Sequence, residues 1–194
     1  MATQTHSNAY TKLMILLQEV DLIIGCLPKR VRGRPRQQLR LATNQKRDAL
    51  CKAVVAMLSA ALEAYCEELC KECNSYLKNH LGGLDQEDYK VIERSIQNSH
   101  GANNDHITKL FSLVGISWIT YKSVGWQNKT PEEVREQLRL LAKTRNKIAH
   151  GASVTVSEPK VRSHRDFVFR LAGRLESITG SHLADRTNTS APWN

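Results

Sequence analysis

A long amphipathic segment between residues 45 and 80 constrains the fold of this chain more than any other feature. Apolar side chains recur along it at three- and four-residue steps, so they share one stripe of a helix. The stripe consists of Cys51, Val54, Val55, Leu58, Leu62, Tyr65, Leu69, Cys73 and Tyr76. Gly82 and Gly83 end the pattern. The segment therefore predicts one long helix with a face that other elements must cover.

Three further segments predict amphipathic helices. The first spans residues 7–26, begins at a capping Ser7 and ends before Pro28. A second begins at Thr130, where a capping Thr is followed by Pro and Glu, and continues to Gly151. The last covers about residues 159–178. We expect shorter helices at about 85–96 and 105–114, and an irregular apolar connection over residues 115–129.

The composition also favours helices over sheets. Aromatic residues make up 6% of the 194 residues, whereas the strands of sandwiches and barrels prefer aromatic and β-branched side chains. The sequence thus predicts an all-α fold, an antiparallel bundle of about four main helices plus short ones. We expect a single domain over residues 1–180, and a polar, disordered tail over residues 181–194.

The sequence predicts a cytoplasmic protein without metal or cofactor. Its start lacks a basic region followed by an apolar stretch, and no apolar run is long enough for a membrane span. The five cysteines are odd in number, which suits reduced thiols better than disulfides. Cys70 and Cys73 form a C-x2-C pair, but the chain has no second pair for a tetrahedral zinc site.

Positive charge is concentrated in one segment. The net charge is +9, and eight cations without any acid lie between residues 29 and 47. In the connection over residues 28–44, the candidate nucleic-acid-binding residues are Lys29, Arg30, Arg32, Arg34, Arg36 and Arg40. Such a cluster is typical of a polyanion-binding surface, although a solvated loop that aids solubility has the same composition. The string Arg32-Gly33-Arg34-Pro35 resembles the core of an AT-hook, which would bind the DNA minor groove, and the same loop could follow an RNA backbone.

The candidate catalytic residues lie at the end of the helix that starts at Thr130. Arg145 falls on the stripe of Leu138, Leu141 and Ile148, so its guanidinium is expected on the buried or half-buried side. Asn146 and His150 are four residues apart, which allows the amide to orient the imidazole. Together these groups can hold a phosphodiester, stabilise its developing charge and transfer protons near neutral pH. The structural alternative is a core ion pair for Arg145 and a helix cap formed by the other residues.

These residues resemble the signature of HEPN-domain ribonucleases. In that signature an Arg precedes a His by a short spacing, as in the string Arg145-Asn146-Lys147-Ile148-Ala149-His150-Gly151. The string Leu62-Glu63-Ala64-Tyr65 and residues 110–116 are also similar to the RiboL-PSP branch of that superfamily. The likeness covers roughly residues 45–175.

The resemblance implies an all-α homodimer in which two copies of the motif form one composite RNA-cleaving site without a metal. His150 would act as general base or acid on the ribose 2′-hydroxyl, Arg145 would hold the scissile phosphate, and Asn146 would orient His150 or the substrate. The products would be a 2′,3′-cyclic phosphate and a 5′-hydroxyl end. The family also implies a toxin or antiviral defence role, with RNA as substrate and an antitoxin or other regulatory partner.

Glu63 is a supporting candidate, because a carboxylate among Ala60, Ala61 and Leu62 would need a partner such as Arg145 or His150. An exposed Glu63 fits the helical spacing equally well. We expect His100, His106, His164 and His182 at the surface or at caps.

The alternative function is a non-catalytic helical module that uses its Arg-rich loop to bind nucleic acid or a protein partner. Among nucleic acids, DNA is the weaker expectation.

Overall fold

The computed structural model describes residues 5–28, 37–81, 86–99 and 101–193, without the side chains of residues 37–40, 86, 122 and 123. This part of the chain contains helices and no strand, which confirms the predicted all-α bundle. The elements are α1 (Asn8–Gly25), α2 (Gln37–His80), α3 (Gln86–Gln97), α4 (Asn104–Ser112), the π-helical turn η1 (Ile119–Ser123), α5 (Pro131–Ala149) and α6 (Glu158–Thr187).

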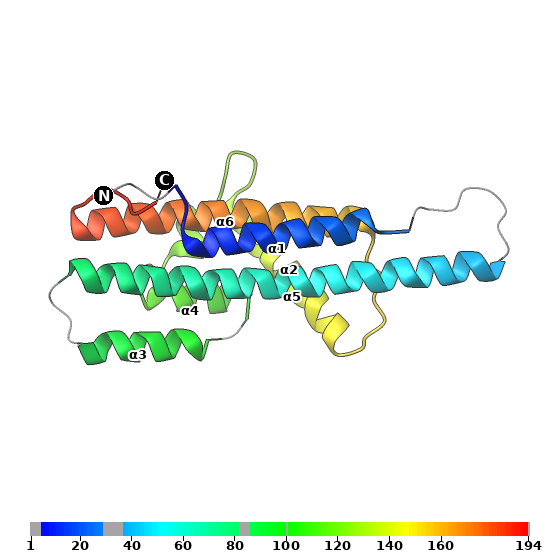
Figure 1. Ribbon diagram of the computed structural model, residues 1–194, viewed down its shortest axis with the longest axis horizontal. Coiled ribbons are helices and arrows are strands. Elements are labelled where there is room, and N and C mark those ends of the chain that lie inside the picture. The colour runs from blue at the N-terminus through cyan, green and yellow to red at the C-terminus, as the bar shows by residue number, and fades with distance from the viewer. Residues whose placement is uncertain (1–4, 29–36, 82–85, 100, 194) are drawn as a thin grey trace.

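Helix α2 forms the axis of the bundle. It packs against α1, α3, α4, α5 and α6, and Figure 1 shows it running the length of the molecule. The apolar stripe predicted from the sequence faces these neighbours, and Leu58, Leu62 and Leu69 are completely buried. The helix starts at Gln37, earlier than the predicted residue 45. Arg, Gln and Leu are good helix formers, so these residues extend the helix beyond α1 and α6 without an apolar stripe.

Helix α1 runs antiparallel to α2 and α6 (Figure 1). Carboxylates from both neighbours hold its first turn. The predicted Ser7 cap is confirmed, because its Oγ accepts a hydrogen bond from the Tyr10 amide at 3.0 Å. Glu72 of α2 accepts one from the Ala9 amide at 2.6 Å, and the buried Glu176 of α6 accepts one from the Ser7 amide at 2.6 Å. The negative charges lie where the helix dipole favours them.

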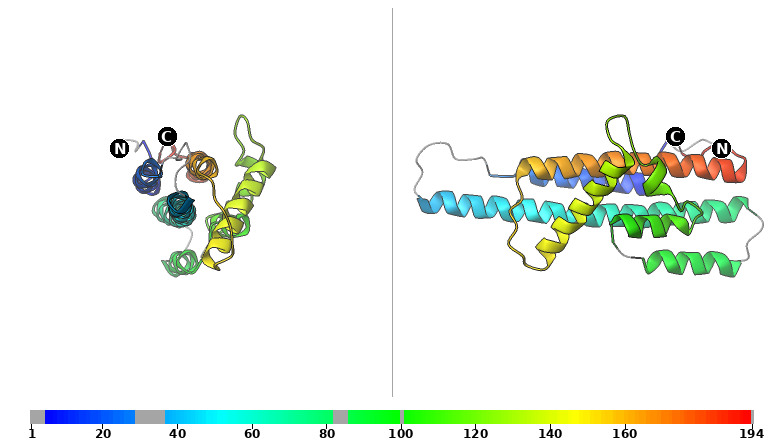
Figure 2. Two further views of the ribbon diagram at one scale, coloured as in Figure 1. Left: turned by 90° about the vertical axis from the view of Figure 1, so that its right-hand side faces the viewer. Right: turned by 180° about the vertical axis from the view of Figure 1, so that it is seen from behind.

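Helix α5 crosses α2 and α6 obliquely, as Figure 2 shows from behind. The connection that follows α5 is tied back to α2, because the Val156 amide donates to Asp48 Oδ1 at 3.1 Å. Arg47 forms an ion pair with Glu158 at the start of α6 and donates to the Pro28 carbonyl at 2.8 Å. These two neighbouring α2 residues therefore fix the ends of three other segments.

The predicted disordered tail over residues 181–194 is wrong for the described residues. Helix α6 continues through Thr187, and the side chain of Trp193 is buried. The Trp193 indole donates a hydrogen bond to the Glu176 carbonyl at 3.0 Å. Gly180 leaves room for this indole, since a Cβ there would lie 3.1 Å from Trp193 Nε1. One aromatic anchor thus orders a segment whose composition is otherwise polar.

One helix of the described chain is long and apolar enough to cross a membrane by length and composition. It is α2, over Leu41–His80, and half of its most apolar stretch is buried inside the bundle. That burial is what the central helix of a bundle requires. The sequence predicted that no apolar run is long enough for a membrane span, and α2 differs from that prediction by length and composition. The prediction that this segment is a helix of the core is confirmed.

His164 was expected at the surface or at a cap, but it is 7% exposed in α6, and its Nε2 has no hydrogen-bond partner among the described residues. Burial, with a smaller effect of Lys160, lowers the pKa of His164 to about 4 from its usual 6.5. The folded protein therefore holds this imidazole neutral at pH values where the unfolded chain protonates it.

We predict that the free energy of unfolding falls as the pH drops from about 6.5 to about 4, because only the unfolded state gains this proton. The loss should reach roughly 1–3 kcal/mol. In urea titrations at several pH values, His164→Leu should flatten the fall, whereas His80→Gln at the exposed end of α2 should keep it. An equally steep fall in His164→Leu would contradict the assignment.

Candidate functional site

Helix α5, which carries the candidate residues in its last turns, is capped at both ends. The predicted capping box is present at its start, where Thr130 Oγ1 accepts from the Glu133 amide and Glu133 Oε2 accepts from the Thr130 amide. At its end, Gly151 has a φ of 68°, and the Ala152 amide donates to the Lys147 carbonyl at 2.9 Å. This left-handed glycine stops the helix directly after His150.

Arg145 is exposed, so the prediction of a half-buried guanidinium is wrong. Arg145 follows Leu141 by one helical turn, and the apolar residues Val134, Leu138 and Leu141 are buried as predicted. However, the end of α5 extends away from α2 and α6, and no neighbouring helix covers its last turns in Figures 1 and 2. Ile148, the next apolar residue of this face, is only partly buried against the core, and the Arg145 side chain beside it is exposed.

Asn146 and His150 are also exposed at this helix end. The Asn146 side chain accepts a hydrogen bond from Arg145 Nη1 at 3.1 Å, rather than binding the His150 imidazole as expected. His150 is the C-terminal cap residue, and its amide donates to the Asn146 carbonyl at 3.0 Å. All three candidate residues are thus solvent-accessible at one helix end, but side-chain contact is present only between Arg145 and Asn146 among the described residues.

Beside this group lies a polar pocket of about 260 Å³, which we call the Glu63 pocket. It is formed by Ser59 and Glu63 of α2, the segment before and at the start of α4, and α5; the lining residues are Ser59, Glu63, Gly101, Ala102, Asn103, His106, Ala142, Arg145 and Asn146. The supporting candidate Glu63 therefore lies in the same pocket as Arg145 and Asn146. Both the carboxylate and the guanidinium face a common space.

The Glu63 carboxylate is held in place by the backbone before α4. The Gly101 amide donates a hydrogen bond to Glu63 Oε1 at 2.5 Å. Gly101 has a φ of 118°, and a Cβ at this position would lie 2.4 Å from His106 Nδ1. A glycine is therefore required here, because it allows the His106 imidazole to pack against the same backbone that binds Glu63.

The place of His106 in this pocket could not be predicted from the sequence. The residue lies at the surface as expected, in the first turn of α4, where its amide donates a hydrogen bond to the Asn103 side chain at 2.9 Å. Its presence beside Glu63 depends on how α4 packs against α2 and α5. No local pattern of residues encodes that packing. His100 lies outside the described residues.

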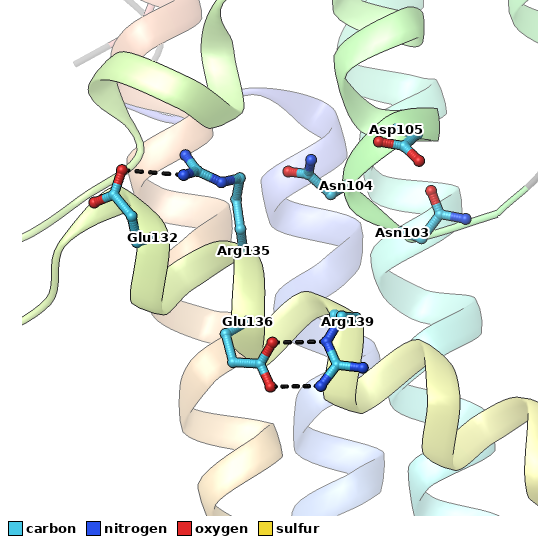
Figure 3. A pocket seen from close by; sticks show the side chains of 7 residues that line it. All are labelled: Asn103, Asn104, Asp105, Glu132, Arg135, Glu136 and Arg139. Carbon is cyan, nitrogen blue, oxygen red and sulfur yellow. Dashed lines mark hydrogen bonds and ion pairs between the residues drawn. The ribbon is translucent and has the colours of Figure 1, made fainter.

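A larger surface cavity of about 510 Å³ lies further along α5, between Asn103, Asn104 and Asp105 on one side and four charged α5 residues on the other (Figure 3). Its arginines are already paired within α5: Arg135 with Glu132 at 3.0 Å, and Arg139 with Glu136 at 2.6 Å. Figure 3 shows both carboxylates turned toward these guanidinium groups. We therefore place the candidate site at the Glu63 pocket, where Arg145 has no carboxylate at ion-pair distance among the described residues.

The predicted nucleic-acid-binding residues of the basic loop lie mostly outside the described residues. This applies to Lys29, Arg30, Arg32, Arg34 and Arg36. Arg40 belongs to the first turns of α2, and its side chain is likewise outside them. The placement of Arg40 within a helix shortens the connection that was expected to extend over residues 28–44.

The cysteines contain no disulfide and form no metal site among the described residues. Cys51, Cys66, Cys70 and Cys73 are buried free thiols, and Cys26 is exposed. Cys70 donates a hydrogen bond to the Leu110 carbonyl at 3.3 Å, and burial raises the pKa of Cys66, Cys70 and Cys73. In these positions the thiols act as small apolar core residues.

An all-α bundle with an Arg-Asn-x-x-x-His group at an exposed helix end defines a domain of the HEPN class. The RiboL-PSP-HEPN family model matches residues 34–180, so the chain belongs to this family. The match includes all of α2 to α5, the Glu63 pocket and most of α6. Comparison with curated proteins and with solved structures gave no match. Domains of this class have ribonuclease-type or nucleotide-related functions, and they are commonly ribonucleases.

The helix stop after His150 gives a direct test of the local structure. Gly151→Ala should lower the free energy of unfolding by about 1–2 kcal/mol, because alanine is strained at positive φ although no atom lies within 4 Å of the new Cβ. Gly25→Ala is the matched control, since its Cβ also meets open space, but its φ is not positive. Equal unfolding midpoints for the two variants would contradict the strain assigned to Gly151.

Proposed function

We propose that this protein is a metal-independent endoribonuclease whose catalytic group is Arg145, Asn146 and His150. The observation that supports the proposal most strongly is the position of these residues. All three are exposed at the end of α5, within the region that the family model matches, and Arg145 and Asn146 line a polar pocket. A structural helix cap would not require an exposed Arg145 that shares a pocket with Glu63.

The chemistry assigned to the group is transfer of the phosphate to the neighbouring 2′-hydroxyl. His150 removes the proton from the 2′-oxygen, which attacks the phosphorus atom, and the bond to the 5′-oxygen breaks. Arg145 binds the non-bridging oxygens as their negative charge increases. The leaving 5′-oxygen takes a proton from an acid, and the products are a 2′,3′-cyclic phosphate and a 5′-hydroxyl. No step of this proposed reaction uses a metal ion.

A homodimer provides the general acid that this reaction needs in addition to the base. A single imidazole begins the reaction as a base, so protonation of the leaving group requires another acid. In the proposed dimer the α5 ends of two protomers meet, and the second His150 supplies that acid. The exposed end of α5, which has no neighbouring helix over it in Figure 1, is free to take part in such an interface.

The biological role that we propose is growth arrest or antiviral defence, in which RNA cleavage is restrained by an antitoxin or another regulatory partner. The basic segment before and at the start of α2 is proposed to hold the RNA backbone near the site. In the alternative, a non-catalytic module, the same segment binds nucleic acid or a protein and the α5 end is only a cap.

We predict that the purified protein cleaves labelled RNA in excess EDTA. His150→Ala and Arg145→Ala should each lower the cleavage rate at least about 100-fold, because each removes a group that acts on the transition state. His80→Ala, at the exposed end of α2, is the control and should cleave at the normal rate. Circular dichroism should show that all three variants keep their helices.

Two outcomes would contradict the nuclease proposal. One is cleavage that persists in His150→Ala, which would exclude the role of this imidazole. The other is the absence of cleavage over a range of RNA substrates by a folded, dimeric protein, which would favour the non-catalytic module.

The oligomeric state gives a second test. Light scattering coupled to size-exclusion chromatography should give a mass twice that of one chain at micromolar concentration. A monomer that cleaves RNA at a rate linear in protein concentration would contradict a site shared between protomers.

The basic segment is tested by salt dependence. Replacing Arg32, Arg34 and Arg36 by Gln should reduce the slope of log affinity against log salt by up to about two, because each phosphate contact on a single strand contributes about 0.7 to it. Filter binding of single-stranded RNA to the His150→Ala background measures this slope without cleavage. An unchanged slope would show that these arginines serve only solubility.

A further inference from the structure

The Glu63 pocket contains a polar group that the protein itself leaves unpaired. Ser59 is only 5% exposed, yet its hydroxyl makes no hydrogen bond to any described residue. The hydroxyl oxygen is not among the buried polar atoms that lack a partner, so it is accessible from the pocket, where a ligand can bond it. Ser59 lines the pocket together with Glu63, which indicates that a ligand with polar edges fits there.

The charge of the pocket excludes a phosphate from its interior. The Glu63 carboxylate lies inside it and would repel an anion, whereas Arg145, which can bind a phosphate, is an exposed residue of its lining. The volume of about 260 Å³ is slightly below the range of about 300–1,000 Å³ that is typical of small-molecule pockets. The pocket therefore suits one small uncharged unit attached to a phosphate, such as a nucleobase.

We propose that the Glu63 pocket binds a guanine base of the RNA, next to the phosphate held by Arg145. Guanine presents two adjacent N–H donors, N1–H and the N2 amino group, on its Watson–Crick edge. An ionised carboxylate accepts only and has about four lone-pair sites, so Glu63 can accept both donors while Oε1 keeps its bond from the Gly101 amide. The proposal rests on the proposed nuclease function for its substrate class.

Two neighbouring residues complete the recognition of the base. The His106 imidazole provides a flat ring at the pocket wall, on which a base can stack, and the packing of Gly101 fixes its position. The Ser59 hydroxyl bonds the base from the α2 side. Stacking is tolerant of base identity, whereas the bonds to Glu63 are not. His106 therefore contributes affinity, and Glu63 contributes selectivity.

Titration calorimetry with uncharged nucleosides tests the pocket without any cleavage step. Guanosine should bind the full chain about tenfold more tightly than inosine, which lacks the N2 amino group. Adenosine, which has an acceptor at N1 that faces the carboxylate, should bind about 100-fold more weakly than guanosine. Equal affinities for guanosine and adenosine, or the absence of binding by all nucleosides at millimolar concentration, would overturn the proposal.

Three variants separate selectivity from structure. Glu63→Gln should bring the affinities of guanosine and inosine within about twofold of each other, because the carboxylate no longer accepts both donors. His106→Ala should weaken both nucleosides by a similar factor of about 5–100. Glu93→Gln on the exposed face of α3 is the matched control and should leave both affinities unchanged.

The variant Ser59→Ala separates a loss of guanosine binding from a loss of folding. The Ser59 hydroxyl has no partner in the described protein, so its removal should leave the thermal midpoint unchanged or raise it, while guanosine affinity falls several-fold. A guanosine preference that survives Glu63→Gln in a folded protein would overturn the assignment. Guanosine binding by a protein that cleaves no RNA would refute the nuclease function alone and leave the pocket assignment intact.

Discussion

Burial of the α2 stripe is the constraint on which the rest of the structure depends. Five other helices cover parts of this one helix, and its completely buried leucines lie at the centre of the core. Polar residues of α2 then place the surrounding elements: Glu72 holds the first turn of α1, Asp48 holds the connection after α5, and Glu63 holds the backbone before α4. A single helix thus supplies both the core and the contacts that position the candidate site.

The exposure of the α5 end follows from the same arrangement. Because α5 crosses the bundle obliquely, its apolar face is completely buried only up to Leu141, and Ile148 in the last turn is only partly buried against the core. Arg145, Asn146 and His150 are consequently available to a substrate or to a second protomer. The Glu63 pocket lies on the side of α5 that faces α2 and α4, which gives the exposed group a polar recess beside it.

The helices were largely predictable because they depend on local periodicity and on caps such as Ser7 and Thr130. The predictions that failed depend on tertiary packing: Trp193 orders the tail through a contact with α6, and Arg145 is exposed because α5 leaves the bundle. Arg145, Asn146 and Glu63 were found from the sequence, since motif spacing and an isolated carboxylate are local signals. His106 was not, because only the packing of α4 against α2 brings it beside Glu63.

The central claim is that two α5 ends meet to form one site, and a distance between protomers tests it most directly. A spin label on Ala149→Cys, in a Cys26→Ser background that leaves only buried native thiols, reports on this helix end without replacing a candidate residue. Pulsed electron paramagnetic resonance should give one narrow, short distance between the two labels of a dimer. A broad, long distance, with the α5 ends on opposite faces of the dimer, would contradict the shared site.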